Sequence, residues 1–151
     1  MKVMPYVNLA AQWHEERKIL LPIIENVMAS GQYVGGEQIE EFELEASRAL
    51  DVENVVALNS GTDALVCGLL AVGVGPGDEV ITPPNSFVAS TAAIVHLRAK
   101  PVFVDVKEDQ NIDPALIERA ITQHTKAIMP VHLTGRMAEM KVICEIAERH
   151  G

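Results

Sequence analysis

The sequence predicts an α/β domain built on a mainly parallel sheet. From Asn54 onward, short β-branched runs alternate with helical stretches, a pattern typical of parallel strands joined by helices. Glycine and proline residues are scattered along the chain and do not pool in a linker, which favours a single domain or part of one. In such folds ligands bind where the strands end, so we expect the functional residues in the loops that follow the strands.

Two helices are predicted ahead of the first strand. Residues 10–30 carry apolar side chains at helical spacing, and we expect Pro22 either to kink this helix or to restart it before Gly31 ends it. Residues 37–50 place apolar side chains on one face among five glutamates. That second pattern is typical of an amphipathic helix on the surface.

The alternating part of the chain contains four predicted strands and four predicted helices. The strands are expected at residues 55–58, 79–82, 102–106 and 127–131. The helices are expected at residues 62–72, 88–97, 113–121 and 139–150. The first of these helices is apolar nearly all round, so we expect it to be buried. Asp113 and Pro114 supply an N-cap and a first-turn proline to the third, and Gly151 caps the last.

Composition excludes several function classes. The 151 residues include 12 Lys and Arg against 21 Asp and Glu, a formal net charge of -9, and no basic cluster that would bind nucleic acid. The longest apolar run, residues 64–74, is too short to cross a bilayer, so we expect no membrane partner. Cys67 and Cys144 have no ligand spacing, which favours two buried thiols in a reducing cytoplasm over a disulfide or a metal site.

The first candidate binding loop is the segment of residues 59–65, which leads from a predicted strand into a predicted helix. The free N–H groups of such a junction, the helix dipole and the Thr62 hydroxyl suit a phosphate group. Gly61 would let the anion approach the backbone. The alternative is a capping box in which Ser60 and Asp63 only begin the helix. The spacing alone favours neither interpretation.

Two later loops hold further candidates. Phe87 follows the second predicted strand, where an aromatic ring can lie against a flat cofactor, although an anchor in the core is favoured by the sequence alone. His132 follows the fourth predicted strand, and a site histidine and a loop histidine fit it equally well. The other histidines have no ligand spacing and are expected to be structural or surface residues: His14, His96, His124 and His150.

Taken together, these segments resemble the DegT/DnrJ/StrS family of sugar aminotransferases, which are fold-type I enzymes dependent on pyridoxal phosphate. The resemblance covers the whole chain and rests on six segments: SGQYVGGEQIEEFE, VVALNSGTDAL, VGPGDEVITPPNSFVAS, AKPVFVDV, NIDPALIERAIT and KAIMPVHLTGRMAEM. It implies that residues 1–151 are the N-terminal part of the large cofactor-binding domain, with helices on both faces of a truncated sheet.

The resemblance also implies a cofactor site. Gly61 and Thr62 correspond to donors to the cofactor phosphate, and Asp63 helps to shape the same loop. Phe87 corresponds to the aromatic residue that stacks on the pyridine ring. His132 corresponds to a histidine beneath or beside the cofactor. The implied cofactor is pyridoxal 5'-phosphate, and no metal is expected.

The implied reaction transfers an amino group, commonly from glutamate, to a keto sugar attached to a nucleotide. Tyr33 corresponds to a loop that approaches the active site at a dimer interface, so the resemblance implies a substrate contact and a homodimer. The lysine that forms a Schiff base with the cofactor, and the acid that pairs with the pyridine nitrogen, are expected beyond Gly151. No catalytic residue is therefore assigned, and we expect the chain alone to be inactive.

Three alternatives stay open. The first is a sugar dehydratase of the same fold, in which the lysine is replaced. The second is a non-catalytic remnant that dimerises or binds phosphate ligands. The third is an unrelated nucleotide-binding α/β domain, in which the loop at Gly61 would bind a nucleotide.

Overall fold

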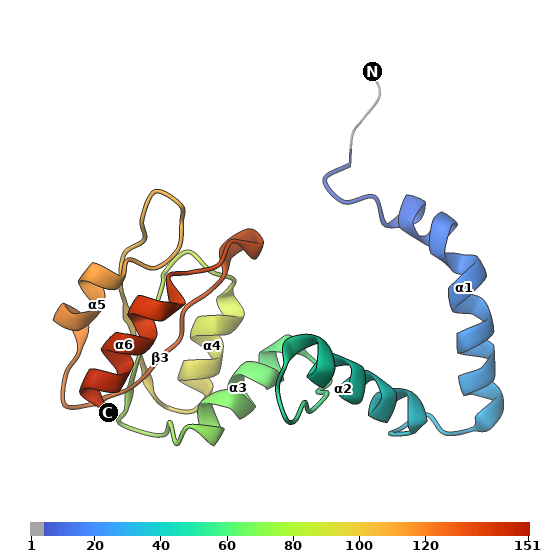
Figure 1. Ribbon diagram of the computed structural model, residues 1–151, viewed down its shortest axis with the longest axis horizontal. Coiled ribbons are helices and arrows are strands. Elements are labelled where there is room, and N and C mark those ends of the chain that lie inside the picture. The colour runs from blue at the N-terminus through green and yellow to red at the C-terminus, as the bar shows by residue number, and fades with distance from the viewer. Residues whose placement is uncertain (1–4) are drawn as a thin grey trace. The chain divides into compact units, whose positions relative to one another are not determined.

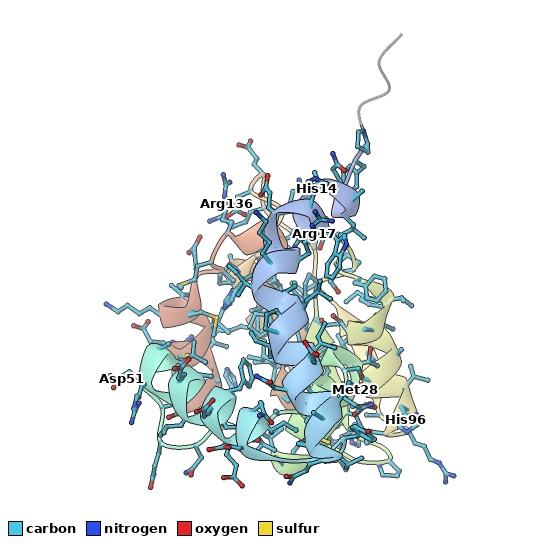
Figure 2. All side chains as sticks on the ribbon, turned by 90° about the vertical axis from the view of Figure 1, so that its right-hand side faces the viewer. His14, Arg17, Met28, Asp51, His96 and Arg136 are labelled. Atoms are coloured by element: carbon cyan, nitrogen blue, oxygen red, sulfur yellow. The ribbon has the colours of Figure 1, made fainter. Side chains whose placement is uncertain are left out.

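The computed structural model describes residues 5–151, which divide into two compact units between Ala57 and Leu58. The first unit holds two helices, α1 (Leu9–Ser30) and α2 (Glu37–Leu50). No residue of either helix is buried, and Figure 2 shows side chains projecting on both sides of α1. The predicted surface position of α2 is therefore confirmed.

Helix α1 begins and ends at residues suited to those positions. The side chain of Asn8 accepts a hydrogen bond from the N–H of Ala11 at 3.1 Å, and Gly31 ends the helix with a left-handed φ of 72°. The helix continues through Pro22, which removes one backbone donor but neither ends nor restarts it. The prediction of a restart was wrong because the residues on both sides of Pro22 keep helical geometry.

The strand predicted at residues 55–58 is absent, which corrects the sequence analysis. The segment lies outside every strand of the structure, and no other segment among residues 5–151 pairs with it. The N–H of Ala57 donates to the carboxylate of Glu43 at 2.7 Å in place of a neighbouring strand. A β-branched run predicts an extended backbone, but a strand also requires a partner with free N–H and C=O groups.

The second unit is built on three parallel strands, in the order β2 (Lys100–Phe103), β1 (Glu79–Thr82), β3 (Thr125–Ile128). Strand β1 is central and every residue in it is buried. The two outer strands end earlier than predicted. Strand β3 ends at Ile128, two residues before Pro130, and beyond β2 Val106 forms an antiparallel bridge with Ile112.

Helices cover both faces of this sheet. Helices α3 (Gly61–Ala71) and α4 (Val88–His96) pack on the face that holds Val80, and α5 (Pro114–Ala120) and α6 (Met140–His150) on the face that holds Ile81. Neighbouring strand residues point to opposite faces, so β1 contributes to two separate cores. Figure 1 shows α5 beside α6. The predicted α/β architecture with helices on both faces is confirmed.

Two burial predictions were wrong. In α3, which is apolar nearly all round, only Leu69 is buried, because the second unit provides no element that covers the other sides of the helix. Cys67 of α3 and Cys144 of α6 are free and exposed, not buried. None of the helices among residues 5–151 combines the length and the apolar character that a membrane crossing requires.

Candidate functional site

The loops that follow the three parallel strands are joined by hydrogen bonds. The buried Thr82, the last residue of β1, donates from its hydroxyl to the carbonyl of Met129, just after β3, at 3.0 Å. The amide of Asn85, in the loop after β1, donates to the carbonyl of Gln110, in the turn after β2, at 3.0 Å. These bonds hold the loops together as one surface at the carboxyl edge of the sheet.

The amino end of α3 points to this same edge. A Cβ atom at Gly73, just after α3, would lie 3.5 Å from Cε of Lys126, near the amino end of β3. Helix α3 also lines a groove along residues 126–129. Because its carboxyl end lies beside the amino end of β3, α3 runs antiparallel to the strands. A helix of 11 residues is about 16 Å long, enough to return to the carboxyl edge.

Ser60 caps α3 without occupying its first two N–H groups. Its hydroxyl accepts from the N–H of Asp63 at 3.1 Å and donates to the Asp63 carboxylate at 3.0 Å, and its carbonyl accepts from Ala64. Among residues 5–151, the N–H groups of Gly61 and Thr62 have no acceptor. No atom lies within 4 Å of the position a Cβ would take at Gly61. The capping interpretation is confirmed, and two donors stay available to an anion.

Phe87 is exposed, so the core anchor favoured by the sequence alone was wrong. It is the N-cap residue of α4, with an extended backbone, and 78% of its surface is accessible. Its carbonyl accepts from the N–H of Ser90 at 3.1 Å, which fixes the start of the helix. The exposed ring lies in the loop after the carboxyl end of β1, where it is accessible to a flat ligand.

His132 lies in the loop after β3, at the start of the short 3-10 helix η1 (Leu133–Gly135). Its Nδ1 atom lies 3.1 Å from the backbone nitrogen of Ala138. A backbone N–H can only donate, so Nδ1 accepts and the neutral ring carries its proton on Nε2. The ring is exposed, and this Nε2–H group is the donor it offers at the carboxyl edge.

Tyr33 belongs to the first unit, in the loop between α1 and α2. Its side chain is 64% exposed, and its hydroxyl donates to the carbonyl of Met28, in the last turn of α1, at 3.2 Å. The hydroxyl is therefore engaged within its own unit. The loop continues through Gly35 and Gly36, whose φ values of 72° and 111° are left-handed and favour glycine.

Two cavities of the second unit are lined by residues other than the predicted site residues. One, of about 440 Å³, is lined by residues 121–123 and 125–128 together with Ala147, His150 and Gly151. The other, of about 380 Å³, is the groove between α3 and β3. Neither is lined by Phe87 or His132, so the candidate site lies on exposed loops outside these two cavities.

The other histidines and the acidic side chains form no metal site among the described residues, where no three of His, Cys, Asp or Glu gather. His96 stands at the carboxyl end of α4 (Figure 2), whereas Phe87 is the N-cap residue of the same helix. Glu79 lies at the amino edge of the sheet and bridges Lys100, at 2.8 Å, and Thr122, at 2.6 Å. The hydrogen bonds from Lys100 and Thr122 lower the pKa of the Glu79 carboxyl.

One residue at the carboxyl edge was missed by the sequence analysis. Asn111 is 2% exposed, and its side chain makes hydrogen bonds to the loop that carries His132. The only local signal is an asparagine two residues ahead of the N-cap Asp113. That signal does not reveal a partner more than twenty positions away in the sequence.

Comparison with known proteins gives a consistent result. The sequence model of the DegT/DnrJ/EryC1/StrS aminotransferase family matches residues 15–151. The chain is 42% identical over 149 residues to dTDP-3-amino-3,4,6-trideoxy-alpha-D-glucose transaminase of Streptomyces venezuelae, a match that covers 98% of this chain and 39% of that protein. It is 42% identical over 138 residues to 3-oxo-glucose-6-phosphate:glutamate aminotransferase of Bacillus subtilis, covering 91% of this chain and 31% of that protein.

A solved structure gives the same result for the fold. The crystal structure of NtdA from Bacillus subtilis with bound cofactor PMP superposes with a TM-score of 0.94 and 38% sequence identity, over 99% of this chain and 35% of that chain. The predicted fold-type I class is therefore confirmed. The chain spans 39% and 31% of the length of the two curated relatives.

Proposed function

The chain belongs to the DegT/DnrJ/EryC1/StrS aminotransferase family, and from that premise we propose that residues 1–151 are the N-terminal part of the large domain of a pyridoxal-phosphate-dependent sugar aminotransferase. The proposed acceptor is a keto sugar attached to a nucleotide, and the proposed amino donor is glutamate. The name of the Streptomyces relative, which includes a dTDP-linked sugar, supports the acceptor, and the name of the Bacillus relative, which includes a 3-oxo sugar phosphate and glutamate, supports the keto group and the donor. The lysine that binds the cofactor covalently belongs, in this proposal, to the rest of the protein, so residues 1–151 are inactive alone.

One observation carries the cofactor proposal. The first turn of α3 keeps the N–H groups of Gly61 and Thr62 free of protein acceptors, while its own cap uses the next two donors. An anion there is also stabilised by the helix dipole, typically by about 0.3–1 kcal/mol. These groups fit a phosphate ester. The aromatic ring of Phe87, exposed at the same edge of the sheet, fits the flat ring that the phosphate would carry.

Each residue has a defined part in this proposal. Gly61 and Thr62 donate to the phosphate, and Asp63 shapes their loop by holding the Ser60 hydroxyl. Phe87 lies against one face of the cofactor ring and excludes water from it. His132 supplies an N–H donor beside the ring. When bound, pyridoxal phosphate supplies the electron sink on which the exchange of amino groups depends.

The same proposal includes a homodimer in the cytoplasm, with Tyr33 contacting the substrate. The apolar side chains of α1 and α2 support association, since none of their residues is buried and Ile24 and Phe42 are 50% and 60% exposed. The free thiols of Cys67 and Cys144 support a reducing compartment. Light scattering on the purified protein tests the assembly: twice the mass of one chain is expected, and a monomer at all concentrations would contradict it.

The test of the proposed function uses the protein produced from its complete gene. We expect a visible absorption band from bound pyridoxal phosphate, and we expect glutamate to bleach it as the amino group moves to the cofactor. A keto sugar nucleotide should then restore the band. A colourless protein that added pyridoxal phosphate leaves unchanged would overturn the proposal. A protein that binds added pyridoxal phosphate without forming the band of a lysine Schiff base would favour the dehydratase, in which that lysine is replaced.

A further inference from the structure

Asn111 is a buried polar side chain in the turn between β2 and α5. Its backbone is held on both sides, because its N–H donates to Oδ1 of Asp109 at 3.1 Å and its carbonyl accepts from the N–H of Lys107 at 2.9 Å. Hydrogen bonds from the N–H and the side chain of Asn111 lower the pKa of the Asp109 carboxyl, which Lys107 and Arg136 lower further. The turn is therefore a rigid base from which the Asn111 side chain projects.

The Asn111 side chain bonds to the loop of residues 132–138, here called the histidine loop. Its Oδ1 atom accepts from the N–H of Leu133 at 3.1 Å. Its Nδ2 atom lies 3.3 Å from the carbonyl oxygen of Arg136 and 3.4 Å from that of Met137. A backbone N–H only donates and a carbonyl only accepts, so these partners fix which way the amide faces.

These contacts lie at both ends of the histidine loop. Leu133 follows His132 directly, and Met137 directly precedes Ala138, whose N–H donates to Nδ1 of His132 at 3.1 Å. Between them Thr134 has a φ of 53°, a left-handed conformation that costs a β-branched residue energy and persists only where surrounding contacts enforce it. One amide therefore closes the loop that sets the orientation of the His132 ring.

We propose that Asn111 is a positioning residue: its buried amide holds the histidine loop closed, so that His132 keeps Nδ1 on Ala138 and presents Nε2–H at the carboxyl edge of the sheet. The direction of that N–H toward a cofactor rests on the proposed function. The control of the ring by Asn111 does not, because every contact in the argument is within residues 107–138.

The amide is the group that this position requires. An aspartate has the same shape and keeps the acceptor for Leu133, but it turns an anionic oxygen toward two carbonyl oxygens and toward Asp109, which lies 3.4 Å from Nδ2. Alanine removes the donor and the acceptor together and leaves the carbonyls of Arg136 and Met137 without their partner. Asn111→Asp and Asn111→Ala should therefore both open the histidine loop, for different reasons.

The experiment reads the His132 ring directly. Nitrogen-15 NMR of the full-length protein, with the resonances assigned from a His132→Gln variant, distinguishes the two neutral tautomers. In the wild type we expect a single tautomer with the proton on Nε2, and we expect slow hydrogen exchange at the N–H of Ala138. In Asn111→Asp and Asn111→Ala we expect a mixture of tautomers, and exchange at Ala138 faster by on the order of tenfold or more.

A matched control separates positioning from a general loss of stability. Ile94→Val removes a methylene from the core on the opposite face of the sheet and should leave the His132 tautomer unchanged. The proposal is overturned if both Asn111 variants keep one tautomer and slow exchange at Ala138. It is also overturned if the wild-type proton is on Nδ1, a result that needs no variant to fold. Neither readout uses pyridoxal phosphate, so the failure of cofactor binding would be a separate result.

Discussion

The hydroxyl of Ser60 accepts a hydrogen bond from the N–H of Asp63 at 3.1 Å and donates one to the carboxylate of the same residue at 3.0 Å. This reciprocal pair begins α3 and turns the Asp63 charge toward Ser60. The cap uses the third N–H of the helix and leaves the first two, those of Gly61 and Thr62, to a ligand. The two interpretations that the sequence left open, a helix cap and a phosphate site, are therefore compatible.

Removing the cap should lower stability. In Ser60→Ala the N–H of Asp63 loses its acceptor, so the free energy of unfolding should fall by about 1 kcal/mol, within the usual range of about 0.5–2 kcal/mol. Chemical denaturation measures the change. Ser60→Thr retains the capping hydroxyl and should lose much less, and equal losses in the two variants would contradict the assignment of the stabilisation to the hydroxyl.

A methyl group at Gly61 should separate folding from phosphate binding. The position has open space around it and a φ that is not left-handed, so Gly61→Ala should change the free energy of unfolding by less than about 0.5 kcal/mol. The same methyl group lies where the anion approaches the backbone, so we expect affinity for pyridoxal phosphate to fall by on the order of tenfold, or about 1.4 kcal/mol. Equilibrium dialysis measures the affinity.

The same helix provides the matched control. Gly68 also has no atom within 4 Å of its Cβ position, but it lies in the middle of α3. Gly68→Ala should raise the free energy of unfolding by about 0.5–1 kcal/mol through helix propensity and should leave cofactor affinity unchanged. If Gly61→Ala and Gly68→Ala affect binding equally, the phosphate does not bind at the first turn.

Removing the ring of Phe87 should weaken cofactor binding without destabilising the fold. Because the side chain is 78% exposed, Phe87→Ala should change the unfolding free energy by less than about 0.5 kcal/mol. Loss of an aromatic contact should cost about 0.5–1.5 kcal/mol of binding, or roughly two- to tenfold in affinity. Phe87→Tyr keeps the ring and should bind as the wild type does. A large fall in the melting temperature of Phe87→Ala would contradict the exposed position and indicate that Phe87 packs in the core.

Acid should destabilise the second unit through two carboxyl groups. Glu79, paired with Lys100 and Thr122, and Asp109, bonded to Asn111, have pKa values below their ordinary 4.5 and 3.8. A carboxyl group with a lowered folded pKa stabilises the native state above its unfolded pKa, and this stabilisation is lost as the pH falls from there through the folded pKa. The urea concentration at the midpoint of unfolding should therefore decrease as the pH is lowered below about 4. This decrease with pH should be less steep in Glu79→Gln. An unchanged slope in that variant would contradict the assignment to Glu79.

The helices of this fold could be predicted from the sequence because their signals are local. Apolar spacing, the N-cap Asp113 and the terminal Gly31 determine where helices begin and end, and the observed bounds agree to within a residue or two. The strand at 55–58 failed because pairing depends on a partner that local pattern does not contain. The burial of Cys67 failed for a similar reason, since an apolar helix indicates burial only where another element covers it.

In the candidate site, too, the residues with local sequence signals could be predicted and those that depend on distant contacts could not. Gly61 and Thr62 stand in the loop that begins α3, whose chemistry can be read from seven consecutive residues. Phe87 could not be assigned to the core or the surface from its neighbours in sequence, because exposure depends on the packing of α4. The role of Asn111 was hidden completely, since its bonds to Leu133 and Met137 cross 22 and 26 positions of the chain.

The central claim is that the first turn of α3 holds the phosphate of pyridoxal phosphate, and backbone amide NMR tests it most directly. Adding pyridoxal phosphate to the full-length protein should shift the N–H resonances of Gly61 and Thr62, whereas pyridoxal without its phosphate should shift them little. Inorganic phosphate should compete for the same two groups. Binding of pyridoxal phosphate that leaves Gly61 and Thr62 unchanged and instead shifts residues of the groove between α3 and β3 would contradict the account.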